Sequence, residues 1–294
     1  MPDPIDAPSE AGHGPERAST SPPVRTAPCS VLVLTWNEAV NIRDCLASAS
    51  FSDDLVVFDS FSHDETVELA LAAGARVFRH AFVNYGAQRE AARTTVDFRH
   101  DWVLSLDADE RVEPDLACEL PAALAAATPG TGAFRLRRKD YFRGRWIRRA
   151  TLYPTWHVRV FRPRAVRYPD RAVHEYPEVD GSIGELRGHL RHDNFSKGIA
   201  DWWRRHLRYA ELEAEEVKRA RAVGGFDWST LADRDPVVRR RALKRLSYAL
   251  PWRPELRYLY MMVLRGALLD GPVGWEYCRM ISEYQRFTDQ LARS

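Results

Sequence analysis

Four short apolar runs rich in β-branched residues recur along the first part of the chain, and each ends in polar residues. They span residues 30–35, 55–58, 75–78 and 102–106. The segments between them, residues 37–49, 64–73 and 85–96, have the spacing of amphipathic helices. Strands that alternate with helices of this length predict right-handed βαβ units. We therefore expect an α/β fold with a mostly parallel sheet and helices on both of its faces.

Local signals refine these boundaries. Ser62 and Glu65 have the Ser-x-x-Glu spacing of a capping box, which predicts a helix starting near Asp64. Gly74 is expected to end that helix. After residue 130 the pattern changes: residues 133–138 and 155–161 read as strands. The chain from Ser196 onward reads mostly as helix, over residues 199–221, 236–249 and 255 to the end, with an interruption near 271–272.

The predicted organisation has three parts. Residues 1–28 contain seven prolines and almost no large apolar side chains, which predicts a disordered tail. Residues 29–195 form the predicted α/β domain, and residues 196–294 form a helical region that could contact a membrane surface. The chain has 294 residues, of which 45% are hydrophobic, enough for a substantial core.

Charge is distributed unevenly along the chain. Residues 30–127 carry 17 acidic and 7 basic side chains, whereas residues 137–171 carry 12 basic and 2 acidic ones. This asymmetry suggests a metal site beside a surface that handles anions. No nucleic-acid recognition motif is present, so nucleic acid is not an expected partner. The four cysteines are far apart and form no Cys-x-x-Cys pair, which predicts reduced cysteines without a zinc site.

Polar side chains follow three of the predicted strands. Thr35, Asn37 and Glu38 follow the first strand; Asp59, Ser60 and Ser62 follow the second; Asp107 and Asp109 follow the fourth. The carboxyl ends of parallel strands meet at one edge of a sheet, where ligands bind. Two aspartates there offer hard oxygen ligands for Mg²⁺ or Mn²⁺ and, through the ion, for a diphosphate. The alternative is that Asp107 and Asp109 only cap a following helix.

Several segments together resemble the family 2 glycosyltransferases of GT-A fold, and in particular the branch acting on the bacterial lipopolysaccharide core. They lie in order over residues 29–290: residues 35–38, 57–60, 84–89, 106–110, 141–147, 159–162, 173–175 and 268–271. That branch includes β-glucosyltransferases. An ordered series of this length is far more specific than one Asp-x-Asp motif.

The resemblance implies roles for individual residues. Glu38 and Asp59 would hold the nucleobase and ribose end of a nucleotide-sugar donor, with Thr35 and Asn37 beside them, and Gln88 and Arg89 would line the donor pocket. Asp107 would lie by the ribose and the metal. Asp109, with Asp107 and His192, would bind a divalent cation, Mg²⁺ or Mn²⁺. Glu175 would be the catalytic base of an inverting transfer; its alternative is a salt bridge with a nearby arginine.

Three positions depart from the family pattern. Relatives often have glycine and threonine where this chain has Phe61 and His63, and many have asparagine in place of Glu90. The Phe61 change removes a permissive glycine from a turn, which leaves the shape of the loop after Asp59 open.

The resemblance also implies partners and a location. A UDP-sugar is the expected donor and a lipid-linked saccharide the expected acceptor. The N-terminus lacks the apolar segment of a signal peptide, so we expect a cytoplasmic protein, peripheral on the inner face of the inner membrane. The basic segment from Arg137 to Arg171 could face anionic lipid or a phosphorylated core saccharide. Residues 202–205 and 258–269 could lie in a membrane interface, which we favour, or pack a helical subdomain against the sheet. The alternatives are a polyprenyl-phosphate sugar transferase, a sugar-phosphate nucleotidyltransferase, and a degenerate transferase acting as a non-catalytic assembly partner.

Overall fold

The computed structural model describes residues 26–151, 153–169, 177–222, 227–232 and 236–294, so residues 1–25 of the predicted disordered tail lie outside it. The first half alternates strands with helices, as the sequence predicts. The strands are β1 (Ser30–Thr35), β2 (Leu55–Asp59), β3 (Arg76–Arg79) and β4 (Val103–Asp107). The helices are α1 (Ile42–Ser48), α2 (Thr66–Ala72), α3 (Tyr85–Thr95) and α4 (Pro114–Ala125).

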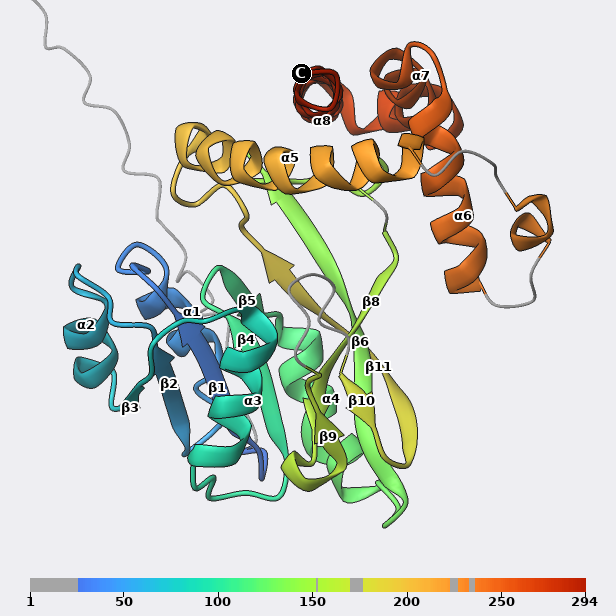
Figure 1. The fold of residues 1–294 in the computed structure, drawn as a ribbon. Coiled ribbons are helices and arrows are strands. Elements are labelled where there is room, and N and C mark those ends of the chain that lie inside the picture. Colours follow the sequence, from blue (N-terminus) through green and yellow to red (C-terminus); the bar gives the residue numbers. More distant parts are fainter. Residues whose placement is uncertain (1–25, 152, 170–176, 223–226, 233–235) are drawn as a thin grey trace, which may run out of the picture.

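The main sheet has the order β3-β2-β1-β4-β8-β6-β11-β5, and β3, β2, β1 and β4 are mutually parallel (Figure 1). The second half adds β5 (Glu110–Val112), β6 (Thr131–Phe142), β7 (Arg145–Trp146), β8 (Thr155–Phe161) and β11 (Ser182–His192). β8 is antiparallel to β4 and β6, whereas β11 is parallel to β6 and antiparallel to β5. β9 (Val166–Arg167) and β10 (Glu178–Val179) pair separately, after the 3₁₀ turn η1 (Pro163–Ala165). The predicted mostly parallel α/β sheet is confirmed.

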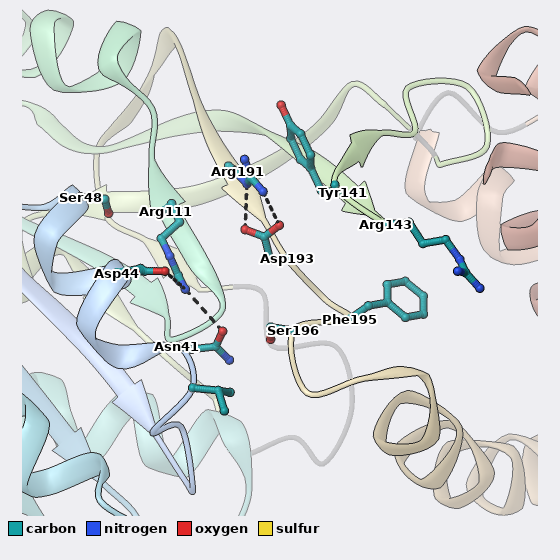
Figure 2. A pocket seen from close by; sticks show the side chains of 12 residues that line it. Asn41, Asp44, Ser48, Arg111, Tyr141, Arg143, Arg191, Asp193, Phe195 and Ser196 are labelled. Atoms are coloured by element: carbon teal, nitrogen blue, oxygen red, sulfur yellow. Dashed lines mark hydrogen bonds and ion pairs between the residues drawn. The ribbon is translucent and has the colours of Figure 1, made fainter.

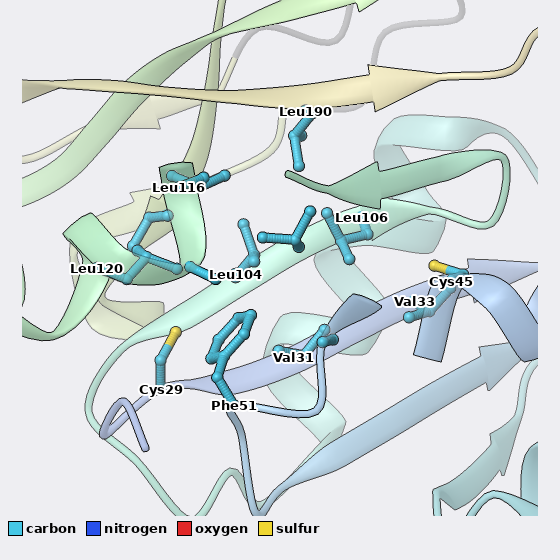
Figure 3. Packing of buried hydrophobic residues seen from close by; sticks show 14 of the residues in the cluster. Cys29, Val31, Val33, Cys45, Phe51, Leu104, Leu106, Leu116, Leu120 and Leu190 are labelled. Atoms are coloured by element: carbon cyan, nitrogen blue, oxygen red, sulfur yellow. The ribbon is translucent and has the colours of Figure 1, made fainter. Parts of the chain in front are cut away.

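Both faces of β1, β2 and β4 are buried, which explains their uninterrupted apolar runs, whereas the edge strand β3 is only partly buried. Val31 and Val33 pack with α1 and α4 on one face, where Figure 3 shows the tight packing around Leu104 and Leu116. Leu32, between them, points to the other face and packs with α3. This period of two is the geometry of a strand. The resulting core fixes the strand ends on which the polar residues sit.

Two local predictions are wrong. The first helix begins at Ile42 and not at Asn37, because Asn37 has a φ of +54° and the following residues form a loop. The predicted capping box does not form: Ser62 Oγ donates to Asp59, and Glu65 makes no side-chain cap bond. Asp64 Oδ1 instead accepts from the backbone N–H of Thr66, 3.1 Å away. Helix α2 therefore starts at Thr66.

Strand β11 has no counterpart in the prediction. It is rich in glycine, arginine and histidine, which are weak strand formers. Its glycines are required by close packing: a Cβ at Gly188 would lie 2.4 Å from the Cα of Leu116 on α4. A close approach of this kind depends on tertiary contacts that a local pattern does not record.

The predicted helical C-terminal region is confirmed. It contains α5 (Ile199–Ala222), η2 (Trp228–Leu231), α6 (Pro236–Ala249), α7 (Arg253–Leu259), the π-helical turn η3 (Tyr260–Leu264), η4 (Ala267–Asp270) and α8 (Gly271–Leu291). Figure 1 shows these helices beyond one end of the sheet, with α5 running across the ends of the long strands β6 and β11. Trp202, Phe142 and Cys278 share the core that joins them to β6. Among the described helices, none is long and apolar enough to cross a bilayer.

Asp54 ties together the amino ends of three strands. Its carboxylate is buried and accepts from Ser30 Oγ (2.6 Å), from Arg76 Nη2 (2.8 Å) and from the backbone N–H of Arg99 (3.0 Å). Burial by itself raises the pKa of Asp54, but the bonds from Ser30, Arg99 and Arg76 outweigh it and lower the pKa below that of an ordinary aspartate. The ionised carboxylate therefore contributes to stability.

Replacing Asp54 by asparagine is expected to lower the free energy of unfolding by about 1–3 kcal/mol at neutral pH. Because the pKa of Asp54 is lower in the folded chain than the unfolded value of about 3.9, this contribution is present above that value. It is lost as the pH falls through the folded pKa. Urea unfolding of both proteins should show a difference at about pH 7 that narrows at about pH 3.5.

The neighbouring Asp53 supplies the control, since its side chain is 70% exposed and pairs with His100. Asp53→Asn should change stability far less. A difference for Asp54→Asn that persists unchanged at low pH would contradict the assignment.

Candidate active site

The strand register brings the predicted polar residues to one edge of the sheet. Thr35 lies opposite Asp59, and Leu34 lies opposite Asp107. Thr35 Oγ1 donates to Asp59 Oδ1 over 2.8 Å. Both the backbone N–H and the hydroxyl of Ser62 donate to the same carboxylate, at 2.8 Å and 2.5 Å. Asp59 is wholly buried, so its direct effect is to hold the loop that follows β2.

Phe61, at the tip of this loop, has a φ of +56° and is 48% exposed. The backbone thus keeps the left-handed turn that a glycine adopts easily, at a strain of roughly 1–2 kcal/mol for a residue with a Cβ. The bonds from Ser62 to Asp59 hold the turn in place. The loop after Asp59 therefore retains a glycine-type shape although glycine is absent.

The loop after β1 is bonded directly to the loop after β2. The backbone N–H of Asn37 donates to Ser62 Oγ (2.8 Å), and Asn37 Oδ1 accepts from the N–H of His63 (2.8 Å). The N–H of Glu38 donates to Thr66 Oγ1 (2.7 Å). Asn37 therefore holds the loop after β1 against the loop after β2, at the carboxyl edge of the sheet.

Glu38 is held by residues from both ends of the domain. Asn41 Nδ2 donates to one of its carboxylate oxygens (2.7 Å), and Lys197 Nζ lies 2.6 Å from the other. Burial raises the pKa of Glu38 above the ordinary glutamate value although both donors oppose the rise. Lys197 follows β11 and was not predicted. The only hint in the sequence is that Lys197 is one of four lysines in a chain whose other basic residues are arginines.

Asp107 forms ion pairs with two guanidinium groups. Arg89 Nη2 lies 2.7 Å from one oxygen and Arg159 Nη2 lies 2.6 Å from the other. Burial opposes ionisation, but Arg159 and Arg89 hold the pKa of Asp107 well below its usual range. Arg89, predicted for the donor pocket, also donates to Ser105 Oγ over 3.2 Å. Both oxygens of Asp107 thus face arginines, and this geometry does not support its predicted role as a metal ligand.

Arg159 also binds a second, fully buried carboxylate. Its Nη2 lies 2.7 Å from Glu110 Oε1, and Glu110 Oε2 accepts from the backbone N–H of Asp107 (3.0 Å). Burial lowers the pKa of Arg159, but Asp107 and Glu110 outweigh it and raise the pKa. Glu110 begins β5, so the two aspartates do not cap a helix; α4 starts only at Pro114. The alternative interpretation of the Asp-x-Asp motif, as a cap of the following helix, is therefore wrong.

Asp109 faces His192 across the end of β11. The Nε2 atom of His192 lies 3.4 Å from Asp109 Oδ2, and its Nδ1 atom lies 2.7 Å from Asp140 Oδ1. Burial and Arg138 lower the pKa of His192, but Asp109 and Asp140 outweigh them and raise it to about 9. His192 was predicted here; Asp140 was not, because nothing local to Lys139-Asp140 marks it.

This arrangement fits a divalent cation. A carboxylate oxygen and an imidazole nitrogen point into the same space, and Asp140 orients the far side of the ring, as carboxylates do behind metal-bound histidines. Asp109 and His192 suit Mn²⁺ or Mg²⁺ better than the arginine-bound Asp107. The donor set is incomplete, and the oxygens of a diphosphate and water would complete it.

Gln88 lies behind the edge and not on its surface. It is 2% exposed, contacts His80 Nδ1 at 3.0 Å and donates to Ser60 Oγ over 2.9 Å. It therefore positions Ser60. Glu175, the predicted catalytic base, lies outside the described residues, as does His174.

Glu90 is the third departure from the family pattern and lies away from the edge. It pairs with Arg93 and accepts from the backbone N–H of Tyr168 (3.0 Å). Glu90 therefore joins α3 to the segment that follows β9, where it has a structural effect.

A pocket of about 580 Å³ lies beside this edge (Figure 2). Side chains alternate along a strand, so Arg191 faces this pocket while the adjacent His192 faces Asp109. Arg191 is paired with Asp193 (2.8 Å), and its guanidinium lies over the Tyr141 ring. None of the predicted site residues lines the pocket. Its lining is Val40, Asn41, Asp44, Ser48, Arg111, Tyr141, Arg143, Gly144, Arg191, Asp193, Phe195 and Ser196.

Comparison with known proteins identifies a family. The family described as Glycosyl transferase family 2 matches residues 30–179. A protein described as an uncharacterized glycosyltransferase from Rickettsia bellii is 33% identical over 102 residues, which cover 34% of this chain and 34% of that protein. The lipopolysaccharide core biosynthesis glycosyltransferase LpsC of Rhizobium meliloti is 28% identical over 172 residues, 56% of this chain and 63% of LpsC. The match thus spans about a third of the first relative's length.

Solved structures give weaker likenesses. TarS of S. aureus (residues 1–349) has a TM-score of 0.43 at 16% identity, covering 90% of this chain and 89% of that chain. Glucosyl-3-phosphoglycerate synthase of Mycobacterium tuberculosis, in complex with Mn²⁺, UDP and glucosyl-3-phosphoglycerate, has a TM-score of 0.39 at 19% identity. It covers 56% of this chain and 72% of that chain.

Replacing Arg159 by methionine is expected to lower the free energy of unfolding by about 3–5 kcal/mol, because it leaves Asp107 and Glu110 together without their shared cation. Adding Glu110→Gln should recover part of this loss, since one buried charge is then removed. A double-mutant cycle from urea unfolding measures the coupling.

Arg162→Met is the control. Arg162 directly follows β8, is partly exposed, and its Cζ atom lies 4.3 Å from the centroid of the Trp102 ring. Equal losses at both arginines, or no recovery in the double variant, would show that Arg159 is not the centre of the cluster.

Proposed function

The chain belongs to the family 2 glycosyltransferases and has their GT-A fold, and we propose that it transfers a hexose from a UDP-sugar to a lipid-linked or lipopolysaccharide-core saccharide with inversion. The observation that carries this proposal is the carboxyl edge of the parallel strands. There Asp109 and His192 face each other with Asp140 behind the ring, beside an ionised Asp107. Such an edge suits a nucleotide with its diphosphate.

The donor end of the site comprises the loops after β1 and β2. Glu38 accepts from the nucleobase or ribose, while Asp59, with Thr35, holds the loop that contacts the nucleotide. Asn37 keeps the two loops together. Gln88 positions Ser60, and Arg89 keeps Asp107 ionised so that it can accept from a ribose hydroxyl.

The divalent cation, Mg²⁺ or Mn²⁺, belongs at Asp109 and His192. When bound, it neutralises negative charge on the diphosphate as that group leaves. Asp140 holds the imidazole in the orientation that presents Nε2 to the same space as Asp109. Asp107 contributes charge and hydrogen-bond acceptors nearby, with its own oxygens held by Arg89 and Arg159.

Glu175 is proposed as the catalytic base. It takes the proton of the acceptor hydroxyl as the acceptor oxygen bonds to the anomeric carbon, while the bond from that carbon to the diphosphate breaks on the opposite face. This in-line displacement inverts the anomeric centre. The assignment rests on the family resemblance around Val173-His174-Glu175.

The lipopolysaccharide core is proposed as the acceptor because LpsC matches more than half of the chain. The corresponding location is the cytoplasmic face of the inner membrane. Acceptor choice depends on loop contacts that no motif specifies.

Calorimetric titration with UDP tests the donor and the cation together. Binding is expected with Mn²⁺ and much weaker without it. Asp109→Ala should abolish the Mn²⁺ dependence, and Asp140→Asn should weaken Mn²⁺-dependent binding by about 10–100-fold because the imidazole loses its orienting partner.

Asp115→Asn is the matched control. Asp115, Glu113 and His189 form another group of ligand-type side chains whose ligand atoms lie within 4.8 Å of one another, and Asp115 is bonded to His189 on β11. This variant should bind UDP and Mn²⁺ normally. Metal-dependent binding that survives Asp109→Ala, or that Asp115→Asn removes, would refute the metal assignment; a folded protein that binds GDP and not UDP would refute the nucleotide assignment.

Glu175→Gln keeps the size of the side chain and removes the base. Turnover should fall by about 10²–10⁴-fold while the affinity for UDP is kept. Radiolabelled sugar transfer measures the first quantity and calorimetry the second. Loss of UDP affinity together with turnover would instead identify Glu175 as a structural salt-bridge partner.

A further inference from the structure

The segment from α7 to η4 holds a group of large apolar side chains in solvent, which we term the apolar tip. Its members are 45–78% exposed: Tyr260 (45%), Val263 (62%), Leu264 (78%), Leu268 (49%) and Leu269 (73%). Other side chains of the same segment, Met261, Met262 and Ala267, are buried in the core that includes Trp202 of α5 and Cys278 of α8. The segment is therefore amphipathic and anchored. Single exposed leucines are ordinary, but a contiguous group of this kind marks an interaction surface.

The tip is fixed to a basic loop from the other half of the chain. Arg265 Nη2 donates to the carbonyl oxygens of Thr151 (3.1 Å) and Tyr153 (3.3 Å). Asp270 Oδ2 accepts from the backbone N–H groups of Arg149 and Ala150, each over 2.7 Å. The loop after β7 and the apolar tip therefore form one surface.

That loop gives the surface a positive rim. The exposed arginines are Arg148 and Arg149 in the loop, Arg145 on β7 and Arg257 on α7. None lies within 4.0 Å of an acidic side chain among the residues that the structure describes. The side chain of Arg149 reaches the tip itself, 3.0 Å from where a Cβ at Gly266 would stand.

Three acidic residues on the C-terminal helices have partners of their own. Glu276 pairs with Arg143, and Glu255 with Arg286, each at 2.7 Å. Asp270 is bonded to the loop backbone. Four exposed arginines and the one carboxylate of Asp270 thus give the rim a net positive charge.

We propose that the apolar tip and its arginine rim dock onto an anionic lipid surface. Aliphatic side chains surrounded by arginines, with Tyr260 and the 43% exposed Trp275 beside them, have the composition of a helix that lies in a membrane interface. The apolar side chains enter the headgroup region, and each arginine adds attraction to anionic lipid. The proposal depends on this surface alone and not on the identity of the donor or acceptor.

The surface lies on the C-terminal helices, and Figure 1 shows these beyond the end of the sheet toward which β6 and β11 reach. Helix α5, of the same region, approaches the candidate site: the hydroxyls of Tyr209 on α5 and Tyr85 on α3 are 3.3 Å apart. Docking through the tip would therefore present the sheet edge to the membrane side, where a lipid-linked acceptor is found.

Sedimentation of the full chain with vesicles tests the proposal. Vesicles of phosphatidylcholine with phosphatidylglycerol should bind the protein, and pure phosphatidylcholine vesicles should bind it at least tenfold more weakly, as should the mixed vesicles at high salt. Leu264→Glu with Leu269→Glu should reduce partitioning at least tenfold. Arg148→Gln with Arg149→Gln should reduce it on anionic vesicles only.

Leu71→Glu is the matched control, since Leu71 is 57% exposed on α2, which lies beside the edge strand β3 and not among the C-terminal helices. It should bind vesicles like the unchanged protein. Unchanged circular dichroism and urea unfolding would show that every variant is folded, so the outcome does not depend on the identity of the sugar donor.

Binding that does not differ between anionic and neutral vesicles would overturn the proposal, as would normal binding by the double leucine variant. No vesicle binding, combined with a dimer in ultracentrifugation that the leucine variant dissociates, would overturn it in favour of a second copy of the chain covering the tip.

Discussion

The guanidinium of Arg159 lies buried between two carboxylates, and the site's geometry depends on this contact. A buried charge must be paired, and here one cation from β8 is shared by Asp107, at the end of β4, and Glu110, at the start of β5. The backbone N–H of Asp107 donates to Glu110 in turn. The turn between the two strands, which presents Asp109, is thereby fixed in one conformation before any ligand binds.

The fold of the first half could be predicted because its buried strands appear in the sequence as consecutive apolar residues. β1, β2 and β4 are covered on both faces, so each reads as an apolar run such as Val31-Leu32-Val33, and each run stops where the edge begins. The polar residues at the run ends, Thr35, Asp59 and Asp107, could thus be assigned to one edge before the structure was known. The local capping signal failed because the side chain had another partner: Ser62 bonds to Asp59, three residues before it, and not to the helix that follows.

The remainder of the site depends on contacts between residues far apart in the chain. Strand β11 is composed of weak strand formers, and it is stabilised by pairing with β6 and by the close approach of Gly188 to α4. Strand β11 ends with His192, and Lys197 follows shortly after its end. The partners of these residues, Asp140 and Glu38, lie 52 and 159 positions away. No periodicity within one segment reports such pairs, so only the family resemblance pointed to His192, and nothing pointed to Asp140.

The two aspartates of one motif differ because their partners differ. Asp107 is bound by Arg89 and Arg159, which stay protonated at every physiological pH and cannot yield their place without leaving a buried charge unpaired. Asp109 instead faces an imidazole, which can give up its proton and turn the same nitrogen into a metal ligand. A cation can therefore enter beside Asp109 by displacing a proton, whereas beside Asp107 it would have to displace an arginine. The proposed assignment of the cation to Asp109 and His192, with Asp107 as a fixed anion beside it, is based on that difference in the chemistry of the partners.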